Sequence, residues 1–267
     1  RFIGDIMQEM TLEERKAVSL EILLQIDSLC KQHSIRYYLA YGGLIGAVRH
    51  GGFIPWDDDL DIWMEYEDYK KFEAVAGELD GYYLLKAFDS KGWGRTFGKL
   101  CKAGTLIVDD LGSKSVKRGV SVDVFPLFKC SKADADKLVD LTKMIDRSFR
   151  YQNGYIKSTL KKLVLGLYAF VGKSNKYYCK KFVKFASGLN GDMYYAPSPY
   201  LGKDVHESAL FDSAQISFEG HELCAPKGLD RILTAIYGDY MTPPPEAERI
   251  SNHKVKAYWV DGNNGEA

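Results

Sequence analysis

The feature that most constrains this chain is the stretch FIPWDDDLDIWM, residues 53–64, which places four aspartates within five positions of an otherwise apolar run. Carboxylates this close repel one another, and burying one without a partner costs free energy. In a strand, side chains alternate between faces, so Asp59 and Asp61 project together while Leu60 points into the core. Two carboxylates at this spacing on one rigid strand can hold a divalent cation through oxygen ligands. We therefore predict a metal site at Asp59 and Asp61.

The other two aspartates, Asp57 and Asp58, precede this strand, and their role is open. Strand alternation would put Asp57 on the face of Asp59 and Asp61, and Asp58 on the opposite face. The alternative is a solvated turn that introduces the strand, and we favour that interpretation for Asp57 and Asp58.

A third strand carboxylate is Asp123, which lies between Val122 and Val124 in GVSVDVFPLF, residues 119–128. An aspartate in the middle of a buried strand needs a hydrogen-bonding or functional reason. One interpretation is a hydrogen-bonded structural residue. The other is a third wall of the metal site, in which Asp123 is a metal ligand or a general base.

Two glycines, Gly42 and Gly43, stand between a predicted strand and a short predicted helix in YGGLIGA, residues 41–47. Glycine lets backbone N–H groups approach a phosphate at a helix N-terminus. A plain tight turn fits the pair equally well. The spacing to Gly46 is not that of the dinucleotide fingerprint.

The first half of the chain alternates helical and strand patterns, which predicts an α/β fold of the α+β type with a mixed sheet. A capping box at Thr11 and Glu14 opens a helix over residues 11–33. Further helices are expected over residues 44–51 and 66–79. Strands are expected within 35–41, 59–64, 81–89, 95–102, 105–111 and 119–128.

The second half is mostly helical from Ala133 to Leu189, with interruptions near Asn153 and Gly172. A later helix is expected to begin at Pro226 and stop at Gly238. Residues 243–267 resemble a loop and tail. We expect one compact unit over 1–267. Its parts are a catalytic core (36–130), a basic helical region (131–190) and a C-terminal extension that completes the substrate site (191–267).

The composition is that of an ordinary globular protein, with 46% hydrophobic and 27% charged residues among 267. The five cysteines are far apart, which favours reduced thiols over a zinc site or disulfide framework. The N-terminal residues lack a charged head followed by an apolar run, so we expect a cytoplasmic protein. The longest apolar run, residues 163–172, is too short to cross a bilayer.

The zero net charge hides two opposite regions. Residues 57–80 hold ten acids and two lysines, whereas residues 147–191 hold ten Lys and Arg and no acid. In the basic segment, lysines alternate with aromatic residues. One interpretation of this segment is a solvated helical face. The other is a surface that contacts either the inner face of an anionic membrane or a lipid-linked acceptor. The neutral total and the lack of a known motif argue against nucleic acid.

Taken together, the paired glycines, the Asp-x-Asp strand and the later strand aspartate are the pattern of the nucleotidyltransferase fold. The stretch YGGLIGAVRHGGFIPWDDDLDIWM, residues 41–64, further resembles the LicD family of phosphocholine transferases, relatives of fukutin and the fukutin-related protein. The resemblance continues in GKLCKAGT (98–105), VSVDVFPLF (120–128) and APKGLDRILTAIYGDYMTPPP (225–245), and at His253.

This resemblance implies transfer of a phosphorylated alcohol from a CDP donor to a sugar hydroxyl. It makes Asp59 and Asp61 metal ligands and Asp123 the third carboxylate, with Gly42 and Gly43 framing the phosphate. The expected metal is Mg²⁺, with Mn²⁺ as the other candidate. The gap between Gly43 and Asp59 is slightly longer than in the general fold pattern.

Four further residues are candidates for substrate binding. Arg49 suits a phosphate through bidentate donation, with a surface ion pair as the alternative. Lys99 could meet a phosphate from a neighbouring strand. His253 lies in a polar tail, where a solvated histidine is the default, and the resemblance to the family favours a position that closes over the donor. Tyr240, after a predicted helix end, could line the site. A choline head is best held by aromatic faces, for which the candidates are Trp56, Tyr195, Tyr200, Tyr240 and Trp259.

We therefore expect a Mg²⁺-dependent enzyme that transfers phosphocholine from CDP-choline to a sugar hydroxyl of a lipid-linked or soluble precursor of a cell-surface glycopolymer, such as teichoic acid or lipopolysaccharide. One alternative is the same chemistry with ribitol or glycerol phosphate. An alternative of another class is a noncatalytic protein that binds nucleotides or polyanions.

Overall fold

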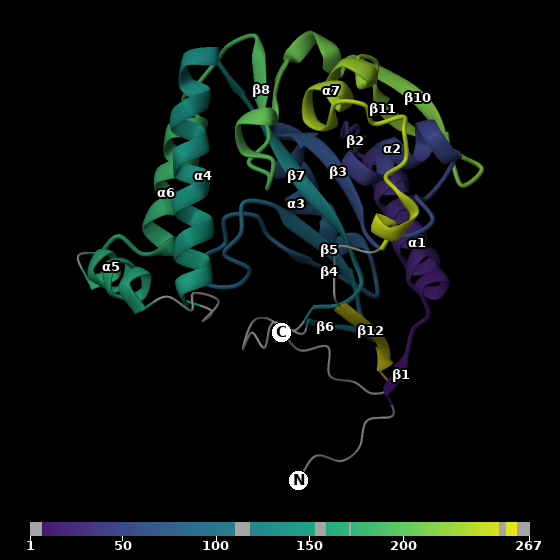
Figure 1. Ribbon diagram of the computed structural model, residues 1–267, viewed down its shortest axis with the longest axis horizontal. Coiled ribbons are helices and arrows are strands. Elements are labelled where there is room, and N and C mark those ends of the chain that lie inside the picture. Colours follow the sequence, from purple (N-terminus) through teal and green to yellow (C-terminus); the bar gives the residue numbers. More distant parts are fainter. Residues whose placement is uncertain (1–6, 110–117, 153–158, 171, 251–254, 261–267) are drawn as a thin grey trace.

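A mixed sheet forms the centre of the computed structural model, which describes residues 7–109, 118–152, 159–170, 172–250 and 255–260 (Figure 1). The strand order is β2-β3-β7-β5-β4. β3 and β7 run parallel, while the other neighbours along this path are antiparallel. The mixed sheet predicted from the sequence is thus confirmed. The strands are β2 (Tyr38–Ala40), β3 (Leu60–Glu65), β4 (Tyr82–Leu85), β5 (Gly98–Lys102) and β7 (Ser121–Cys130).

Three helices from the first half of the chain pack on this sheet: α1 (Leu12–Gln32), α2 (Tyr41–His50) and α3 (Tyr66–Val75). The capping box of α1 forms as predicted, because Thr11 Oγ1 accepts from the Glu14 amide at 3.1 Å and the Glu14 carboxylate accepts from the Thr11 amide at 2.8 Å. The predicted apolar stripe of α1, which includes Leu23 and Ile26, is buried.

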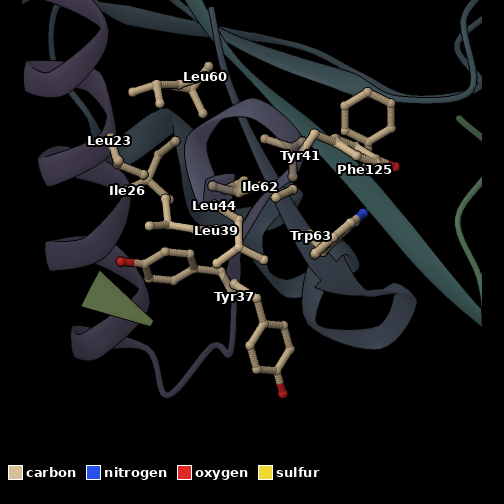
Figure 2. Packing of buried hydrophobic residues seen from close by; sticks show 14 of the residues in the cluster. Leu23, Ile26, Tyr37, Leu39, Tyr41, Leu44, Leu60, Ile62, Trp63 and Phe125 are labelled. Atoms are coloured by element: carbon tan, nitrogen blue, oxygen red, sulfur yellow. The ribbon is translucent and has the colours of Figure 1, made fainter. Parts of the chain in front are cut away.

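The main hydrophobic core lies between these helices and the sheet. In Figure 2, Leu23 and Ile26 of α1 lie beside Leu39 of β2 and Leu44 of α2, with Ile62 of β3 close by. β3 is buried on both faces beyond Asp61, as expected for a parallel strand covered by helices. The aspartates therefore stand at the one end of β3 where the core stops.

A second hydrophobic cluster lies where the helical region meets the far end of β7. Residues Phe128 and Cys130 of β7 pack there with buried side chains of α4 (Lys132–Gln152) and α6 (Asn175–Ala186). Two short strands, β8 (Met193–Tyr195) and β9 (Val205–Glu207), extend the sheet from this end of β7. Helix α5 (Thr159–Phe170) comes between α4 and α6 in the sequence and lies at the edge of the molecule (Figure 1).

Helices thus fill the segment in which the helical pattern was predicted. The break predicted near Asn153 falls outside the described residues, and α6 starts shortly after Gly172. No helix in the described part of the chain is both long and apolar enough to span a membrane.

The end of the chain differs from the expected loop and tail, because Val255–Val260 forms strand β12. β12 pairs with β1 (Met7–Glu9) and β6 (Thr105–Asp109) in a separate sheet. Local sequence could not specify this strand, since both of its partners are distant in the chain. A hairpin of β10 (Ser213–Phe218) and β11 (His221–Pro226) was also not predicted. Single 3₁₀ turns span Ala76–Glu78, Leu201–Lys203, Ser208–Phe211 and Glu246–Glu248.

Two further predictions need correction. Helix α7 covers Leu229–Tyr237 and begins after Pro226, because Pro226 is the last residue of β11. Its end at Gly238 is as predicted. Gly42 and Gly43 do not form a tight turn between a strand and a helix. They lie within α2, in its first helical turn, and α2 follows directly on β2.

Candidate active site

Strand register brings the predicted carboxylates together. Asp61 of β3 is paired with Asp123 of β7, and Asp123 is paired with Lys99 of β5. Paired residues on neighbouring strands project from the same face of a sheet. Three of the predicted site residues thus form one row across the sheet, although they come from segments far apart in the sequence.

The electrostatics of this row indicate mutual repulsion. Burial, together with the negative charges of Asp59 and Asp123, raises the pKa of Asp61 well above its ordinary value, and the positive charge of Lys99 offsets only part of this. Burial and the charge of Asp59 likewise raise the pKa of Asp57 to about 7. Asp61 and Asp123 are neighbours across β3 and β7, and carboxylate oxygens of Asp57 and Asp59 lie within 4.8 Å of each other. We call Asp57, Asp59, Asp61 and Asp123 the carboxylate cluster.

Asp58 differs from its neighbours because it is buried and paired. Arg15 of α1 donates to Asp58 Oδ2 at 2.7 Å, and the Asp58 side chain is only 4% exposed. The solvated turn favoured for Asp57 and Asp58 is therefore wrong for Asp58, whose charge anchors α1 beneath the site. It is also wrong for Asp57, which is half-buried against Asp59. The sequence signal that distinguished Asp57 from Asp58 was strand alternation, which places the two side chains on opposite faces.

The two glycines have different surroundings. A Cβ on Gly42 would lie 2.4 Å from Asp57 Oδ2, so the missing side chain makes room for a member of the carboxylate cluster. A Cβ on Gly43 would lie 3.2 Å from Leu60 Cδ2, on the core side of α2. Amide groups in the first turn of a helix have no intrahelical acceptor. The start of α2 thus presents free donors next to Asp57, whereas a phosphate contact at either glycine remains a prediction.

Tyr41, at the junction of β2 and α2, has a left-handed backbone with φ of 43°, which is uncommon for a residue other than glycine. Its buried phenol donates to Asp204, whose other carboxylate oxygen lies 3.1 Å from His206 Nε2. This contact fixes the start of α2 relative to the C-terminal part of the chain. Sequence analysis did not single out Tyr41, Asp204 or His206.

Lys99 lies in the site but faces a carboxylate. Its Nζ forms an ion pair with Asp123 Oδ1, and both side chains are largely buried. The rings of Trp93 and Phe97 lie 5.6 and 5.5 Å from the ammonium. Lys99 thus compensates the charge of Asp123, and the predicted phosphate contact is untested.

Arg49 belongs to a positively charged group around Trp56. Its Nη1 donates to the carbonyl of Tyr240 at 2.9 Å, and its guanidinium carbon lies 6.0 Å from the centroid of the Trp56 ring. The guanidinium of Arg249 lies 5.5 Å from the same ring. Burial and the charge of Arg249 lower the pKa of Arg49.

Neither Arg49 nor Arg249 forms an ion pair with a carboxylate among the described residues, so the surface ion pair considered for Arg49 is absent from this part of the chain. Two adjacent guanidinium groups that have no carboxylate partner among the described residues are suited to a phosphate-bearing ligand. Arg249 is a candidate that sequence analysis missed, because its position near Arg49 depends on a long-range contact.

Two tyrosines stand beside the carboxylate cluster. Tyr200 packs on Tyr41 with ring centroids 5.1 Å apart and on Tyr237 at 5.3 Å, and the hydroxyl of Tyr237 donates to that of Tyr200 at 2.8 Å. Burial raises the pKa of Tyr200 to about 12, and the charges of Asp61 and Asp59 add to this effect. Aromatic faces thus lie next to the cluster.

Other aromatic candidates lie elsewhere. Tyr195 is fully buried and donates to Thr142, and Trp259 is paired with Thr105 in the outer sheet, so neither faces the cluster. The phenol of Tyr240 donates to Asp230 at 2.7 Å, which leaves its carbonyl as the link to Arg49. His253 lies outside the described residues.

The donor set fits a hard divalent cation. Carboxylate oxygens of Asp57, Asp58 and Asp59 come within 4.8 Å of one another, and this is the one such grouping of His, Cys, Asp and Glu within the described segments. Of the predicted ligands it contains Asp59 but not Asp61 or Asp123. All five cysteines are unpaired, in agreement with the expected reduced thiols. Clustered carboxylates with raised pKa values lose their repulsion when a cation binds. These carboxylates are thus of the kind that binds a hard cation, and the ligand set of Asp59, Asp61 and Asp123 remains a prediction.

Comparison with known proteins agrees with this geometry. Residues 34–171 match the family model described as LicD/FKTN/FKRP, nucleotidyltransferase domain. Lipopolysaccharide cholinephosphotransferase LicD of Haemophilus influenzae is 29% identical over 94% of this chain and 99% of its own length. The human and mouse ribitol 5-phosphate transferase FKRP is 46% identical over only 47 residues, which is 18% of this chain and 10% of that protein.

The matched family region contains α2, β3, β5 and β7, and so it includes every member of the carboxylate cluster. It covers more than half of the chain. The protein therefore belongs to the LicD family of nucleotidyltransferase-like domains.

Proposed function

We propose that this protein transfers phosphocholine from CDP-choline to a sugar hydroxyl of a cell-surface glycopolymer precursor. The observation that carries the proposal is the alignment of Asp61 with Asp123 in the sheet, beside Asp57 and Asp59. A noncatalytic binding protein would not need these repelling carboxylates. The similarity to the Haemophilus influenzae cholinephosphotransferase extends over almost the whole chain and favours choline as the alcohol.

In the proposed reaction, the sugar hydroxyl oxygen attacks the phosphorus of the phosphocholine group. The bond between this phosphorus and the bridging oxygen of CMP breaks, and CMP leaves with the electron pair. Asp123 takes the proton of the hydroxyl, and the product is a phosphodiester. Asp123 is suited to this role because Lys99 holds its carboxylate in place at the edge of the cluster.

Asp59 and Asp61, with Asp123, would hold Mg²⁺ or Mn²⁺. When bound, such an ion supplies positive charge for the phosphate oxygens and for departing CMP. The guanidinium groups of Arg49 and Arg249 donate to phosphate oxygens of the donor and orient it. The backbone amides at Gly42 and Gly43 are further donors at the start of α2.

The choline group cannot donate hydrogen bonds, so aromatic faces and nearby negative charge are its suitable partners. Tyr200 and Tyr237 supply aromatic surface beside Asp59 and Asp61. Each cation–π contact contributes about 0.5–2 kcal/mol. We therefore expect CDP-choline to be the best donor, CDP-ethanolamine to be clearly worse and CDP-ribitol to be almost inactive.

The test is release of CMP from CDP-choline with Mg²⁺ and a saccharide acceptor prepared from lipopolysaccharide or teichoic acid. Comparing kcat/KM for the three donors measures the discrimination directly. If CDP-ribitol or CDP-glycerol is the best donor, the protein transfers another alcohol phosphate. Donor binding without CMP release on any acceptor would support a noncatalytic binding protein.

A further inference from the structure

Helix α5 exposes an apolar stripe. Its side chains Leu160, Leu163 and Leu167 are 71%, 71% and 63% exposed, and Val164 is 46% exposed. The spacing of three and four residues places all four on one helical face. A contiguous group of large aliphatic side chains in water is unusual for a protein surface and marks a site of interaction.

One side of α5, next to the stripe, approaches helix α4. A Cβ on Gly166 would lie 2.9 Å from the hydroxyl of Tyr151 in α4, so the backbone of α5 approaches α4 closely at this glycine. Gly166 is about 100° around the helix from Leu167. Helix α5 thus approaches α4 at Gly166 and lies at the edge of the molecule (Figure 1). The side chains of the apolar stripe are exposed to solvent.

The charges of the helical region identify the partner of the stripe. Lys161 and Lys162 are exposed on α5 itself, and Lys180, Lys181 and Lys184 are exposed on α6, the next helix along the chain. Residues 147–191 contain no acid. A second copy of the chain would bring like charges together. Protein interfaces rely mainly on Trp, Tyr and Arg anchors, whereas this stripe is purely aliphatic. An aliphatic face flanked by lysines matches the acyl region and headgroups of an anionic bilayer.

We propose that α5 lies in the surface of an anionic membrane, with Leu160, Leu163, Val164 and Leu167 among the acyl chains and the lysines at the headgroups. Helix α5 has 12 residues. It is therefore about 18 Å long, whereas the hydrocarbon core is about 30 Å thick. It can lie along the surface but cannot cross it. This proposal does not depend on the proposed transfer reaction.

The test is cosedimentation of the full chain with vesicles of phosphatidylcholine, with and without phosphatidylglycerol. We expect binding to the anionic vesicles that falls with salt. The double substitution Leu163→Ser and Leu167→Ser should weaken it by at least about tenfold. The matched control, Leu12→Ser with Val108→Ser, removes two exposed apolar side chains elsewhere and should bind normally. Circular dichroism verifies that each variant is folded.

A second measurement places the stripe in the bilayer. The substitution Leu163→Trp should add fluorescence that brominated acyl chains quench. Vesicle binding that is unchanged by the Leu163→Ser and Leu167→Ser substitutions would overturn the proposal. So would a change of oligomeric state in that variant without a change in vesicle binding, which would make the stripe an interface between copies of the chain.

Discussion

The carboxylate cluster and helix α5 each contain side chains in surroundings that folded proteins normally avoid. The cluster gathers like charges at the end of a buried strand, and α5 holds aliphatic side chains in water. Both arrangements cost free energy in the isolated chain. In our two proposals a partner relieves each of them: a cation for the cluster, and a lipid surface for α5.

The two regions differ in how their positions are fixed. The pairing of Asp61 with Asp123, and of Asp123 with Lys99, is set by strand register within the main core. A shift of one residue would move every side chain of β3 to the other face. Helix α5 is held chiefly by its contact with α4 and lies beyond the second hydrophobic cluster. We infer that the cluster requires precise geometry, whereas α5 requires only an exposed face of the right chemistry.

The largest expected effect comes from the cluster itself. Asp59→Asn and Asp61→Asn should each reduce transfer by about a thousandfold or more, because each removes negative charge that a cation needs. The unfolding temperature without metal should stay the same or rise, since repulsion with Asp123 is relieved. Thermal unfolding with and without Mg²⁺ is the second measurement, and the stabilisation by Mg²⁺ should be lost.

Asp68→Asn is the matched control for these two variants, because Asp68 is a buried carboxylate of α3 that lies outside the carboxylate cluster. It removes charge from the ion pairs with Lys71 and Arg36 and should cost about 1 kcal/mol of unfolding free energy. The folded fraction should still transfer phosphocholine and respond to Mg²⁺. Near-normal turnover in Asp59→Asn or Asp61→Asn would remove the metal assignment.

A smaller effect is expected at the guanidinium pair. Arg249→Gln should raise KM for CDP-choline about tenfold, because one charged hydrogen bond to the donor is lost. Arg49→Gln should act in the same direction, with an added effect from its lost bond to Tyr240. Steady-state kinetics with varied donor measure this change. The control is Arg231→Gln, which removes an exposed arginine that pairs with Glu207. If the KM of Arg249→Gln equals that of this control, Arg249 is excluded from the donor site.

These residues also show what the sequence alone could predict. The alternation around Leu60 and the valines beside Asp123 were local signals, so Asp59, Asp61 and Asp123 could be proposed as site residues from spacing alone, and the strand register then paired Asp61 with Asp123. The Arg249 contact with Trp56 and the pairing of β12 with β1 depend on segments far apart in the chain. No local pattern specifies which distant segments meet, and these features appear only in the folded structure.

The environment of Gly42 allows a finer test of the cluster. In Gly42→Ala, the new Cβ would meet Asp57 Oδ2, which can rotate away at little cost in stability. Transfer should fall by about tenfold, because Asp57 leaves the cluster. This loss corresponds to about 1.4 kcal/mol in the activation barrier. The unfolding temperature should change little. Gly77→Ala, where a Cβ meets no atom within 4 Å, is the control for both measurements. A loss of stability without a loss of rate would make Gly42 a packing residue only.

The smallest effect on the chemistry is expected in the helical region. Lys180, Lys181 and Lys184 are exposed on α6, and each lysine near an anionic membrane contributes about 1 kcal/mol of binding. Reversing all three to Glu should weaken vesicle binding by about a hundredfold or more, whereas transfer to a short soluble acceptor should stay within about twofold. Lys227→Glu, at an exposed lysine between β11 and α7, is the charge-reversal control. The two regions are separable only if the α6 variant loses activity on a lipid-linked acceptor and keeps it on the soluble one. An equal loss of activity on both acceptors would mean that the basic helices contribute to the active site. The carboxylate cluster and the helical region would then not have separate roles in catalysis and membrane binding.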